Sequence, residues 1–470
     1  MTSDTATFRR SDYCGLFTRL RVPVIWLVLW WVWSSFSSVA SAQASSSSSL
    51  PVISDAESIV LPTSFNEVDF YLITVDVGDN IWDNFGHTAL RVVDRNSGSD
   101  LVFNWGLFDT SGGNILFASN FLRGILNYQL GVSPPGWEFG RYEREQRTLW
   151  QDRINLTNEQ KATLYRRLAW NLREENIVYS YQYFFDNCTT RPRDYLNEAL
   201  GGRLQDANRS LSQNTFRDEV KAHYASVSAV AVSLDILMNA RIDRRMTQWE
   251  EMFLPAKLRQ ELLSFPSDVI SNGQRLPLLD DSRTLLEFPS PEPQANGYLV
   301  IGAGLLMVAI LLVLSVRRVP LSSFSRQAAF TLRMSLSYRL MGLIGILLSF
   351  ASGVYGTLMA LAWMKSGHLD LHHNLNLLLF WPLDLIGVVF SFRWLLRGRC
   401  CNVGETARSL INAYLILHLL AVLVYIVMVL FDISAQNVGD LLLYFVPAAT
   451  VFSVVVLLTG FAAERRIRFS

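Results

Sequence analysis

Cys188 stands in a polar run that could support nucleophilic chemistry, Asp186-Asn187-Cys188-Thr189-Thr190. The position of Pro192 and the residues after it predict a short helix from near Arg191 to Leu200, so Cys188 lies just ahead of a helix N-terminus. Such a position stabilises a thiolate and lowers the pKa of the thiol. The residue could therefore be a nucleophile, although a buried structural thiol or an intermolecular cross-link would also explain a single cysteine.

A thiolate nucleophile normally works with an imidazole partner. Residues 43–296 contain two histidines, His87 and His223. His87 follows Phe85-Gly86 in a loop that leads directly into a predicted strand, where the backbone geometry is fixed. His223 lies on a predicted exposed helix, where we expect it to be solvated. We therefore predict that His87 is the general base for Cys188.

A third residue would orient the imidazole through its second ring nitrogen. Asn104 on the next predicted strand and Asp109 shortly after it are the candidates, and we prefer Asn104. A hydrogen bond at a strand edge is the alternative role for Asn104.

Strand and helix signals place these residues in an α+β domain. Apolar runs rich in β-branched residues predict strands at 70–77, 88–93 and 101–105. Thr157 and Gln160 form a capping-box pattern before leucines spaced four apart, which predicts a helix. Strands followed by helices indicate the α+β class. The proline-rich residues 265–297 are expected to form a linker to the membrane.

The N-terminus predicts export. Four arginines precede an apolar run at 22–33, and small residues follow it up to Ala42, which is the order of a cleavable secretory signal. An uncleaved anchor is the alternative. Of the four cysteines in the chain, Cys14 lies in this signal and Cys400 and Cys401 follow the predicted third membrane span. Cys188 would then be the single exported thiol.

Long apolar runs after residue 297 predict five membrane spans, each able to cross about 30 Å of hydrocarbon. The predicted spans are residues 298–316, 340–364, 375–392, 409–431 and 441–463. Arginine-rich segments follow the first, third and fifth spans, whereas the loops between them hold a single lysine. The positive-inside rule therefore places the arginine-rich segments and the C-terminus in the cytoplasm, with residues 43–296 outside.

Charge is divided unevenly along the chain, although the net charge is zero. Residues 43–296 carry 24 Lys+Arg against 33 Asp+Glu, whereas residues 297–470 carry 13 against 6. The acidic exported part argues against nucleic acid as a partner, because phosphate binding needs a basic face. We expect neither a metal nor a cofactor.

Polar residues gather at the outer end of the predicted third span. Asn374 and Asn376 could cap the helix, or they could hold a phospholipid headgroup beneath the exported domain. Asp384 lies deeper, where a carboxylate costs at least about 2.5 kcal/mol on insertion scales. Asp384 must therefore face a bundle interior, a wet cavity or a partner such as His418 on the fourth span, whose similar depth allows a hydrogen bond or ion pair.

Two motifs together resemble a known family. Phe85-Gly86-His87-Thr88-Ala89-Leu90, followed about a hundred residues later by Asn187-Cys188-Thr189-Thr190, is similar to the exported N-terminal domain of the Lnb-type lipoprotein N-acyltransferases. The resemblance covers residues 66–202 and extends to Asn374-Leu375-Asn376 and Pro382. It implies a permuted papain-like fold, similar to lecithin:retinol acyltransferase, in which the histidine precedes the cysteine.

The resemblance also implies acyl transfer in two halves. Cys188 would attack a phospholipid acyl ester with His87 as general base, and the N-terminal amine of a diacylglyceryl lipoprotein would then aminolyse the thioester. Asn104 would orient His87, at a position where the retinol acyltransferases carry a second histidine. The expected substrate-binding residues are Asn187, Thr189, Asn374 and Asn376.

The sequence thus predicts a bacterial cytoplasmic-membrane protein with a periplasmic α+β catalytic domain and an all-α membrane domain of five helices. The predicted parts are a signal peptide (1–42), a flexible tether (43–65), the Cys–His domain (66–264), a linker (265–297), the membrane domain (298–463) and a cytoplasmic tail (464–470). The alternatives are a periplasmic cysteine peptidase or amidase, and a membrane-anchored sensor or docking module without enzymatic activity.

Overall fold

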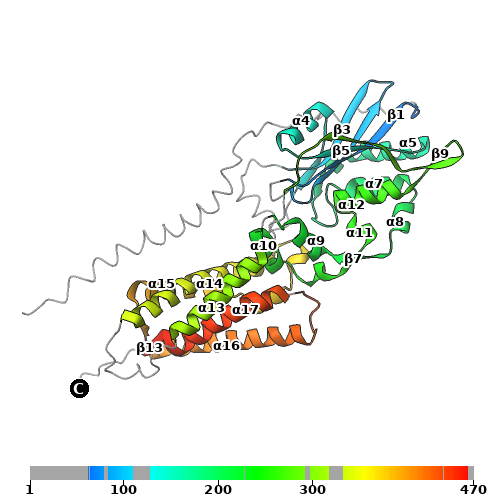
Figure 1. The fold of residues 1–470 in the computed structure, drawn as a ribbon. Helices are drawn as coiled ribbons and strands as arrows, with labels where there is room; N and C mark the ends of the chain where they lie inside the picture. Colours follow the sequence, from blue (N-terminus) through cyan, green and yellow to red (C-terminus); the bar gives the residue numbers. More distant parts are fainter. Residues whose placement is uncertain are drawn as a thin grey trace, which may run out of the picture. The chain divides into compact units, whose positions relative to one another are not determined.

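The computed structural model describes the central and C-terminal parts of the chain (Figure 1). The described residues are 62, 64–78, 83–108, 127–226, 228–291, 297–316, 332–437 and 439–463. The predicted signal peptide, most of the predicted tether, Asp109 and the predicted cytoplasmic tail lie outside them.

Seven strands among the described residues form one antiparallel sheet, in the order β11-β5-β1-β2-β3-β4-β6. The three predicted strands are confirmed as β1, β2 and β3, which lie side by side in the sheet. Phe70, Leu72 and Leu90 are fully buried on these strands, as expected for apolar residues of a sheet covered by helices. The strands are β1 (Val68–Val75), β2 (His87–Asp94), β3 (Ser99–Phe108), β4 (Asn127–Ser133), β5 (Leu149–Ile154), β6 (Val178–Ser180) and β11 (Leu279–Leu286).

Helices of the same part pack on this sheet: α4 contacts β3, α7 contacts β2 and α12 contacts β1. The predicted capping box is present at the start of α5, where Thr157 and Gln160 each accept from the other's backbone N–H. The helices are α4 (Pro135–Arg144), α5 (Asn158–Asn171), α6 (Glu174–Ile177), α7 (Thr190–Ala199), α8 (Arg203–Ala207), α9 (Phe216–His223), α10 (Ser228–Leu237), η3 (Ala240–Asp243), α11 (Gln248–Glu251) and α12 (Pro255–Ser264), with a short ladder of β7 (Leu211–Thr215) and β8 (Arg245–Thr247).

The predicted linker at 265–297 is largely built into the fold. β9 (Pro266–Ser271) and β10 (Gln274–Pro277) pair with each other, and β11 then pairs with β5 at the edge of the main sheet. Pro266 and Pro277 stand at the outer ends of the β9–β10 ladder, where a missing N–H costs little. Pro266 and Pro277, two of the prolines that indicated a linker, therefore lie at strand ends.

The C-terminal part is helical and apolar. Three of its described helices are long and apolar enough to cross a membrane, at Ser335–Lys365, Glu405–Leu430 and Gly439–Gly460. A fourth span is possible if the bent pair Leu369–Leu378 and Pro382–Arg397 counts as one. The elements are α13 (Gly297–Val316), α14 (Leu332–Lys365), η5 (Leu369–Leu371), η6 (Leu375–Leu378), η7 (Pro382–Asp384), α15 (Leu385–Arg397), β12 (Cys401–Val403), α16 (Glu405–Leu430), α17 (Gly439–Val455), η8 (Val456–Gly460) and β13 (Phe461–Ala463).

Five spans are thus not confirmed, and one predicted span differs from the structure. The predicted first span at 298–316 is helical as α13, within which Gly302–Leu312 counts as a shorter apolar helix. Residues 375–392 are not one straight helix, because two short 3₁₀ turns precede α15 and the chain bends by 56° between them. Pro382 lacks the N–H that a continuous helix would use there, which accounts for the break.

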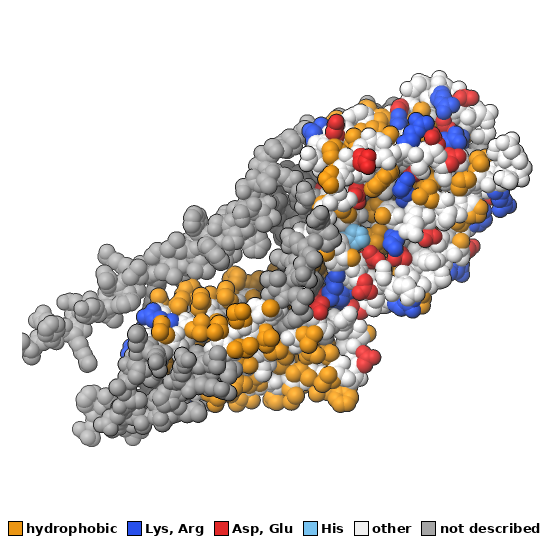
Figure 2. Space-filling view, in the orientation of Figure 1, with side chains coloured by type: hydrophobic (Ala, Val, Ile, Leu, Met, Phe, Trp, Pro, Cys, Tyr) orange, Lys and Arg blue, Asp and Glu red, His pale blue; other side chains and the backbone are white. Residues whose placement is uncertain are grey.

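Asp384 lies near His418, one of the possible partners that the sequence indicates. The His418 Nε2 atom lies 3.5 Å from the Asp384 carboxylate, which also accepts from the Tyr414 hydroxyl at 2.7 Å and from the Ser352 hydroxyl. A carboxylate placed among apolar helices thus has several polar partners. Figure 2 shows apolar side chains gathered over these helices, whereas charged side chains are scattered over the sheet-bearing part.

Candidate active site

His87 and Asn104 meet on neighbouring strands of the sheet. His87 is the first residue of β2, and Asn104 on β3 stands opposite Ala89, two residues further along β2. Residues 87 and 89 share a face because side chains alternate along a strand, so His87 and Asn104 are diagonal neighbours. The His87 Nε2 and Asn104 Oδ1 atoms lie 2.6 Å apart.

Glu138 on α4 fixes the orientation of the Asn104 amide. Asn104 Nδ2 donates to the Glu138 carboxylate at 3.1 Å, and Ser133 and Arg141 donate to the same carboxylate at 2.9 Å each. Both Asn104 and Glu138 are buried, at 1% and 2% exposure. With Nδ2 bound to an acceptor-only group, Oδ1 must face His87 and accept from it. The His87 proton therefore sits on Nε2, and Nδ1 is left as the basic nitrogen.

Cys188 and His87 both lie beside Gly106. The point where a Cβ at residue 106 would sit lies 3.5 Å from Cys188 Cβ and 3.6 Å from His87 Cε1. Gly106 has a φ of +97°, a conformation that favours glycine. A second contact joins the two segments that carry His87 and Cys188, because the hydroxyls of Thr88 and Thr189 lie 3.1 Å apart. The thiol and the imidazole thus border the same small space.

The loop that carries Cys188 is held by Asn187. Asn187 Oδ1 accepts from the backbone N–H groups of Thr189 and Thr190, both at 2.8 Å, at the start of α7. Its Nδ2 group donates to the backbone carbonyls of Tyr183 and Phe253. All four hydrogen-bond partners of the Asn187 side chain are backbone groups. Asn187 therefore fixes the conformation of the loop that carries the Cys188 thiol.

The protonation states of the pair follow from burial. Burial and the guanidinium groups of Arg141 and Arg147 lower the pKa of His87 to about 3, against the opposing effect of its hydrogen bond with Asn104. Burial also raises the pKa of the Cys188 thiol, although hydrogen bonds from Thr189 and the Thr88 backbone favour the thiolate. The predicted lowering of the thiol pKa is therefore not what the structure shows, because desolvation outweighs the helix terminus. At neutral pH a neutral thiol faces a neutral imidazole.

Comparison with known families identifies this part of the chain. Residues 62–222, about a third of the chain, match the family model of the Lnb N-terminal periplasmic domain. Residues 62–222 thus form an Lnb-type domain. This is consistent with the predicted Lnb-type family assignment, and the match contains Cys188, His87 and Asn104. No curated protein and no solved structure shows significant similarity to the chain.

Aromatic side chains line the Lnb-type domain near the thiol. The rings of Tyr128 and Tyr181 stack with their centroids 4.2 Å apart, and Tyr179 lies beside Tyr128 at 6.3 Å. Burial, and then the nearby charge of the Cys188 thiolate, raises the pKa of all three tyrosines. The Cys188 sulfur therefore lies near buried aromatic rings, in surroundings of low dielectric constant.

His223 is not the solvated residue that the sequence predicted. It lies at the end of α9, and its ring stacks on Phe85 with the centroids 4.7 Å apart. Its Nδ1 atom lies 2.8 Å from the backbone carbonyl of Glu219. His223 thus packs against the loop that carries His87 and has no contact with Cys188 among the interactions found in the described residues.

The predicted site residues fall into two groups. Cys188, His87 and Asn104 lie together, with Asn187 and Thr189 in the same loop. Asn374 and Asn376 hydrogen-bond to carbonyls at the end of α10 instead. Their predicted substrate-binding role stays a prediction.

Sequence reasoning missed Glu138 and Gly106. Glu138 lies 34 residues from Asn104 on a different element, and a lone acid after Pro134-Pro135 carries no signal of its own. Gly106, two residues after Asn104, could have been noticed as a glycine that interrupts an apolar strand.

Asn104→Ala should slow formation of the Cys188 thioester by roughly 10²-fold, because a misplaced catalytic group costs about that much. The rate is measured as acylation of Cys188 by a water-soluble ester, followed by mass spectrometry of the intact protein. Ser133→Ala is the matched control, because it removes another partner of Glu138 without touching His87. Equal rates in the Asn104 and Ser133 variants would remove the orienting role of Asn104.

Proposed function

We propose that the protein is a thiol-dependent N-acyltransferase of lipoproteins. It moves an acyl chain from a phospholipid to Cys188 and then to the N-terminal amine of a diacylglyceryl lipoprotein. The observation that carries this proposal is the juxtaposition of Cys188, His87 and Asn104 inside an Lnb-type periplasmic domain that continues into apolar helices. Hydrolysis by the same pair, in a peptidase or amidase, is the competing outcome.

The first half-reaction begins from the neutral pair. His87 Nδ1 accepts the thiol proton as the Cys188 sulfur attacks the carbonyl carbon of the acyl ester, which gives a tetrahedral oxyanion. Collapse of this intermediate breaks the ester C–O bond and leaves the acyl group on sulfur as a thioester. The departing lysophospholipid oxygen takes the proton from His87.

The second half-reaction returns the enzyme to its resting state. The lipoprotein amine attacks the thioester carbonyl and gives up a proton to His87, and an amide forms as the C–S bond breaks. The cysteine sulfur then recovers the proton from the imidazolium. Because His87 is neutral at rest, it is ready to act as base in both halves.

We propose roles and boundaries for the other predicted parts. Asn187 and Thr189 position Cys188 through their contacts in its loop. The catalytic domain runs beyond residue 264 to include β11, which completes its sheet. Five spans and a cytoplasmic C-terminus fit the arginine-rich segments after the first, third and fifth predicted spans, and the periplasmic family of the N-terminal domain fits the same orientation. The permuted papain-like topology stays part of the proposal.

Mass spectrometry of lipoprotein N-termini from cells with and without the protein tests the function. We expect a third, amide-linked acyl chain on the N-terminal cysteine only when the protein is present. Incubation with a phospholipid carrying a labelled acyl chain should leave the label on Cys188 as a thioester. Unchanged lipoprotein N-termini together with peptide cleavage would instead favour the peptidase.

A further inference from the structure

The C-terminal end of helix α10 is unusual because its carbonyl groups are satisfied from outside the helix. The last four C=O groups of an α-helix have no intrahelical partner. In α10 the carbonyl of Leu234 accepts from the Met238 backbone at 2.9 Å, and that of Asp235 accepts from Arg217 at 3.0 Å. These two partners belong to the same exported part of the chain.

The remaining two carbonyls are satisfied by the membrane part. Ile236 O accepts from the side-chain amides of Asn374 and Asn376, both at 2.8 Å, and Leu237 O accepts from Asn374 at 2.9 Å. The donors lie more than 130 residues further along the chain, at the bent segment before α15. They therefore cap a helix of the exported domain from the membrane domain.

The side-chain oxygens of Asn374 and Asn376 also accept hydrogen bonds from the protein. Asn374 Oδ1 accepts from the Asn376 backbone and from Gln436, each at 2.9 Å, and Asn376 Oδ1 accepts from the Tyr425 hydroxyl at 3.1 Å. Asn374 is 3% exposed and Asn376 is 0% exposed. A buried side chain whose hydrogen-bonding groups are engaged by protein serves position rather than ligand binding.

The contact is reciprocal. Asn239, just after α10, donates through its side chain to the carbonyls of Leu369 and His372, and its backbone N–H donates to the Asp370 carbonyl at 2.8 Å. These acceptors belong to the bent membrane segment. Each side of the contact thus satisfies backbone groups of the other.

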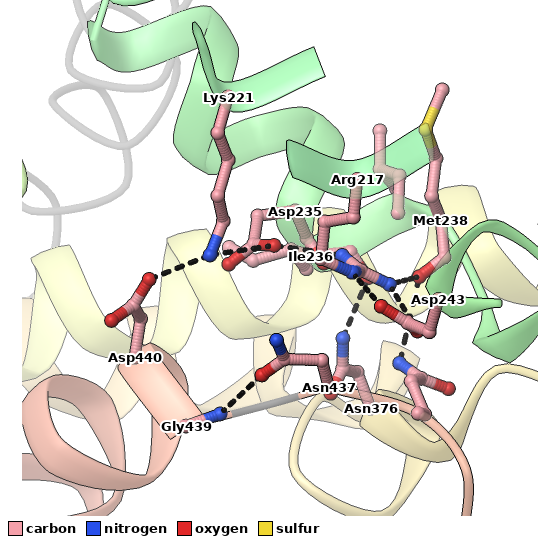
Figure 3. A network of polar contacts seen from close by, with 12 residues as sticks. Arg217, Lys221, Asp235, Ile236, Met238, Asp243, Asn376, Asn437, Gly439 and Asp440 are labelled. Carbon is pink, nitrogen blue, oxygen red and sulfur yellow. Dashed lines mark hydrogen bonds and ion pairs between the residues drawn. The ribbon is translucent and has the colours of Figure 1, made fainter. Parts of the chain in front are cut away.

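A charge network continues the contact (Figure 3). Arg217 is 1% exposed and contacts Asp235 at 2.7 Å and Asp243 at 2.6 Å. Lys221 joins Asp235 to Asp440 of the membrane part, at 3.6 Å and 2.7 Å. Figure 3 shows the Arg217 and Lys221 side chains reaching from the exported helices toward this junction.

An apolar cluster links the same junction to the catalytic loops. Phe184, four residues before Cys188, and Phe85, two residues before His87, pack in one cluster with Phe253. Ala362 at the end of α14 and Leu371 in η5 belong to the same cluster. The thiol-bearing loop is therefore packed continuously with the membrane part.

We infer that residues 216–243 form a dock, a segment that fixes the catalytic half on the membrane half, and that Asn374 and Asn376 are its positioning residues. The inference rests on the proposed function, because the dock would hold Cys188 at a fixed distance from the membrane, at the level of the phospholipid ester groups. Under this view the two asparagines contact the protein, and the substrate is positioned by the geometry that they maintain.

The test uses the full-length protein in vesicles of phosphatidylethanolamine and phosphatidylglycerol. The variants are Asn374→Ala with Asn376→Ala, and the single substitution Asn376→Asp, which keeps the acceptor for Tyr425 but replaces the donor to the Ile236 carbonyl with a carboxyl group. Asn437→Ala is the matched control, because Asn437 is exposed in the neighbouring loop and, among the described residues, accepts from the Gly439 N–H.

Three measurements are made on each variant. They are acyl transfer from vesicle phospholipid to a diacylglyceryl peptide, acylation of Cys188 by a short-chain water-soluble ester, and hydrogen exchange of residues 228–243. We expect at least a tenfold loss of phospholipid transfer, soluble-ester acylation within twofold of the unchanged protein, and faster exchange in the dock. Asn437→Ala should match the unchanged protein in all three.

Other outcomes overturn the inference. Normal phospholipid transfer despite faster exchange would show that the dock does not position the site. A parallel loss with the soluble ester would show that the asparagines maintain the catalytic fold instead. Unchanged exchange in Asn376→Asp would show that these amides do not hold the dock.

The proposed function can fail separately. If the unchanged protein forms the soluble-ester adduct but moves no phospholipid acyl chain, the acyltransferase proposal falls. Hydrogen exchange of residues 228–243 then becomes the test of the dock. Faster exchange in Asn376→Asp would support the dock, and unchanged exchange would overturn it.

Discussion

Cys188→Ala is expected to abolish acyl transfer, with a loss of roughly 10³-fold or more, because no other group can carry the covalent intermediate. Cys188→Ser should fail to the same extent, since a hydroxyl is a far weaker nucleophile than a thiol at the same site. The measurements are transfer to a diacylglyceryl peptide and the mass of the intact protein after exposure to phospholipid. Neither variant should gain the mass of an acyl chain.

Cys400→Ala provides the control for general effects of removing a thiol. Cys400 is half-buried and lies at the predicted cytoplasmic end of the membrane part, next to β12. Its replacement should leave transfer unchanged. Full transfer by Cys188→Ala, with normal protein levels, would discard the nucleophile and the thioester route with it.

His87→Ala should lower the rate of thioester formation by roughly 10²–10⁴-fold, the usual contribution of a general base. Because burial lowers the pKa of His87 to about 3, its basic form persists well below its ordinary value of 6.5. The acylation rate should therefore stay flat as the pH falls from 8 to about 5, and decline only as the pH approaches the folded pKa.

His223→Ala separates the effect of His87 from that of the other histidine in the sheet-bearing part. His223 stacks on Phe85 and should affect the rate far less than His87 does. The raised pKa of the Cys188 thiol predicts no rise in rate on the alkaline side until the pH passes its ordinary value of 9.0. An inflection near pH 6.5 that vanishes in His87→Ala would contradict the low His87 pKa.

Residue type and local pattern were sufficient to predict which residues the structure brings together around His87. The alternation of apolar residues located β1, β2 and β3, and these strands place Asn104 diagonally opposite His87. Cys188 was recognisable because it is a single thiol just before a helix, and that helix is α7. These signals depend on residues close together in the chain, so they can be detected from the sequence alone.

Features that depend on distant partners were not predictable. Glu138 acquires its role only because α4 packs beside β3. Asn374 and Asn376 gave a capping signal, but the carbonyls that they bind belong to α10, far earlier in the chain. The thiol pKa was misjudged for a related reason, since desolvation depends on everything packed around the sulfur.

The pairing of β11 with β5 determines where a fragment of the N-terminal domain can end. A fragment ending at residue 264 would leave β5 with a row of unpaired N–H and C=O groups, and such open edges recruit strands from other copies. It would also remove Ser282, which donates to the buried Asp152 carboxylate on β5. A soluble fragment must therefore run through Leu286, and ten residues lie between Leu286 and the start of α13 at Gly297. That connection spans at most about 40 Å when fully extended, so it limits how far the last strand of the sheet can lie from the first helix of the membrane part.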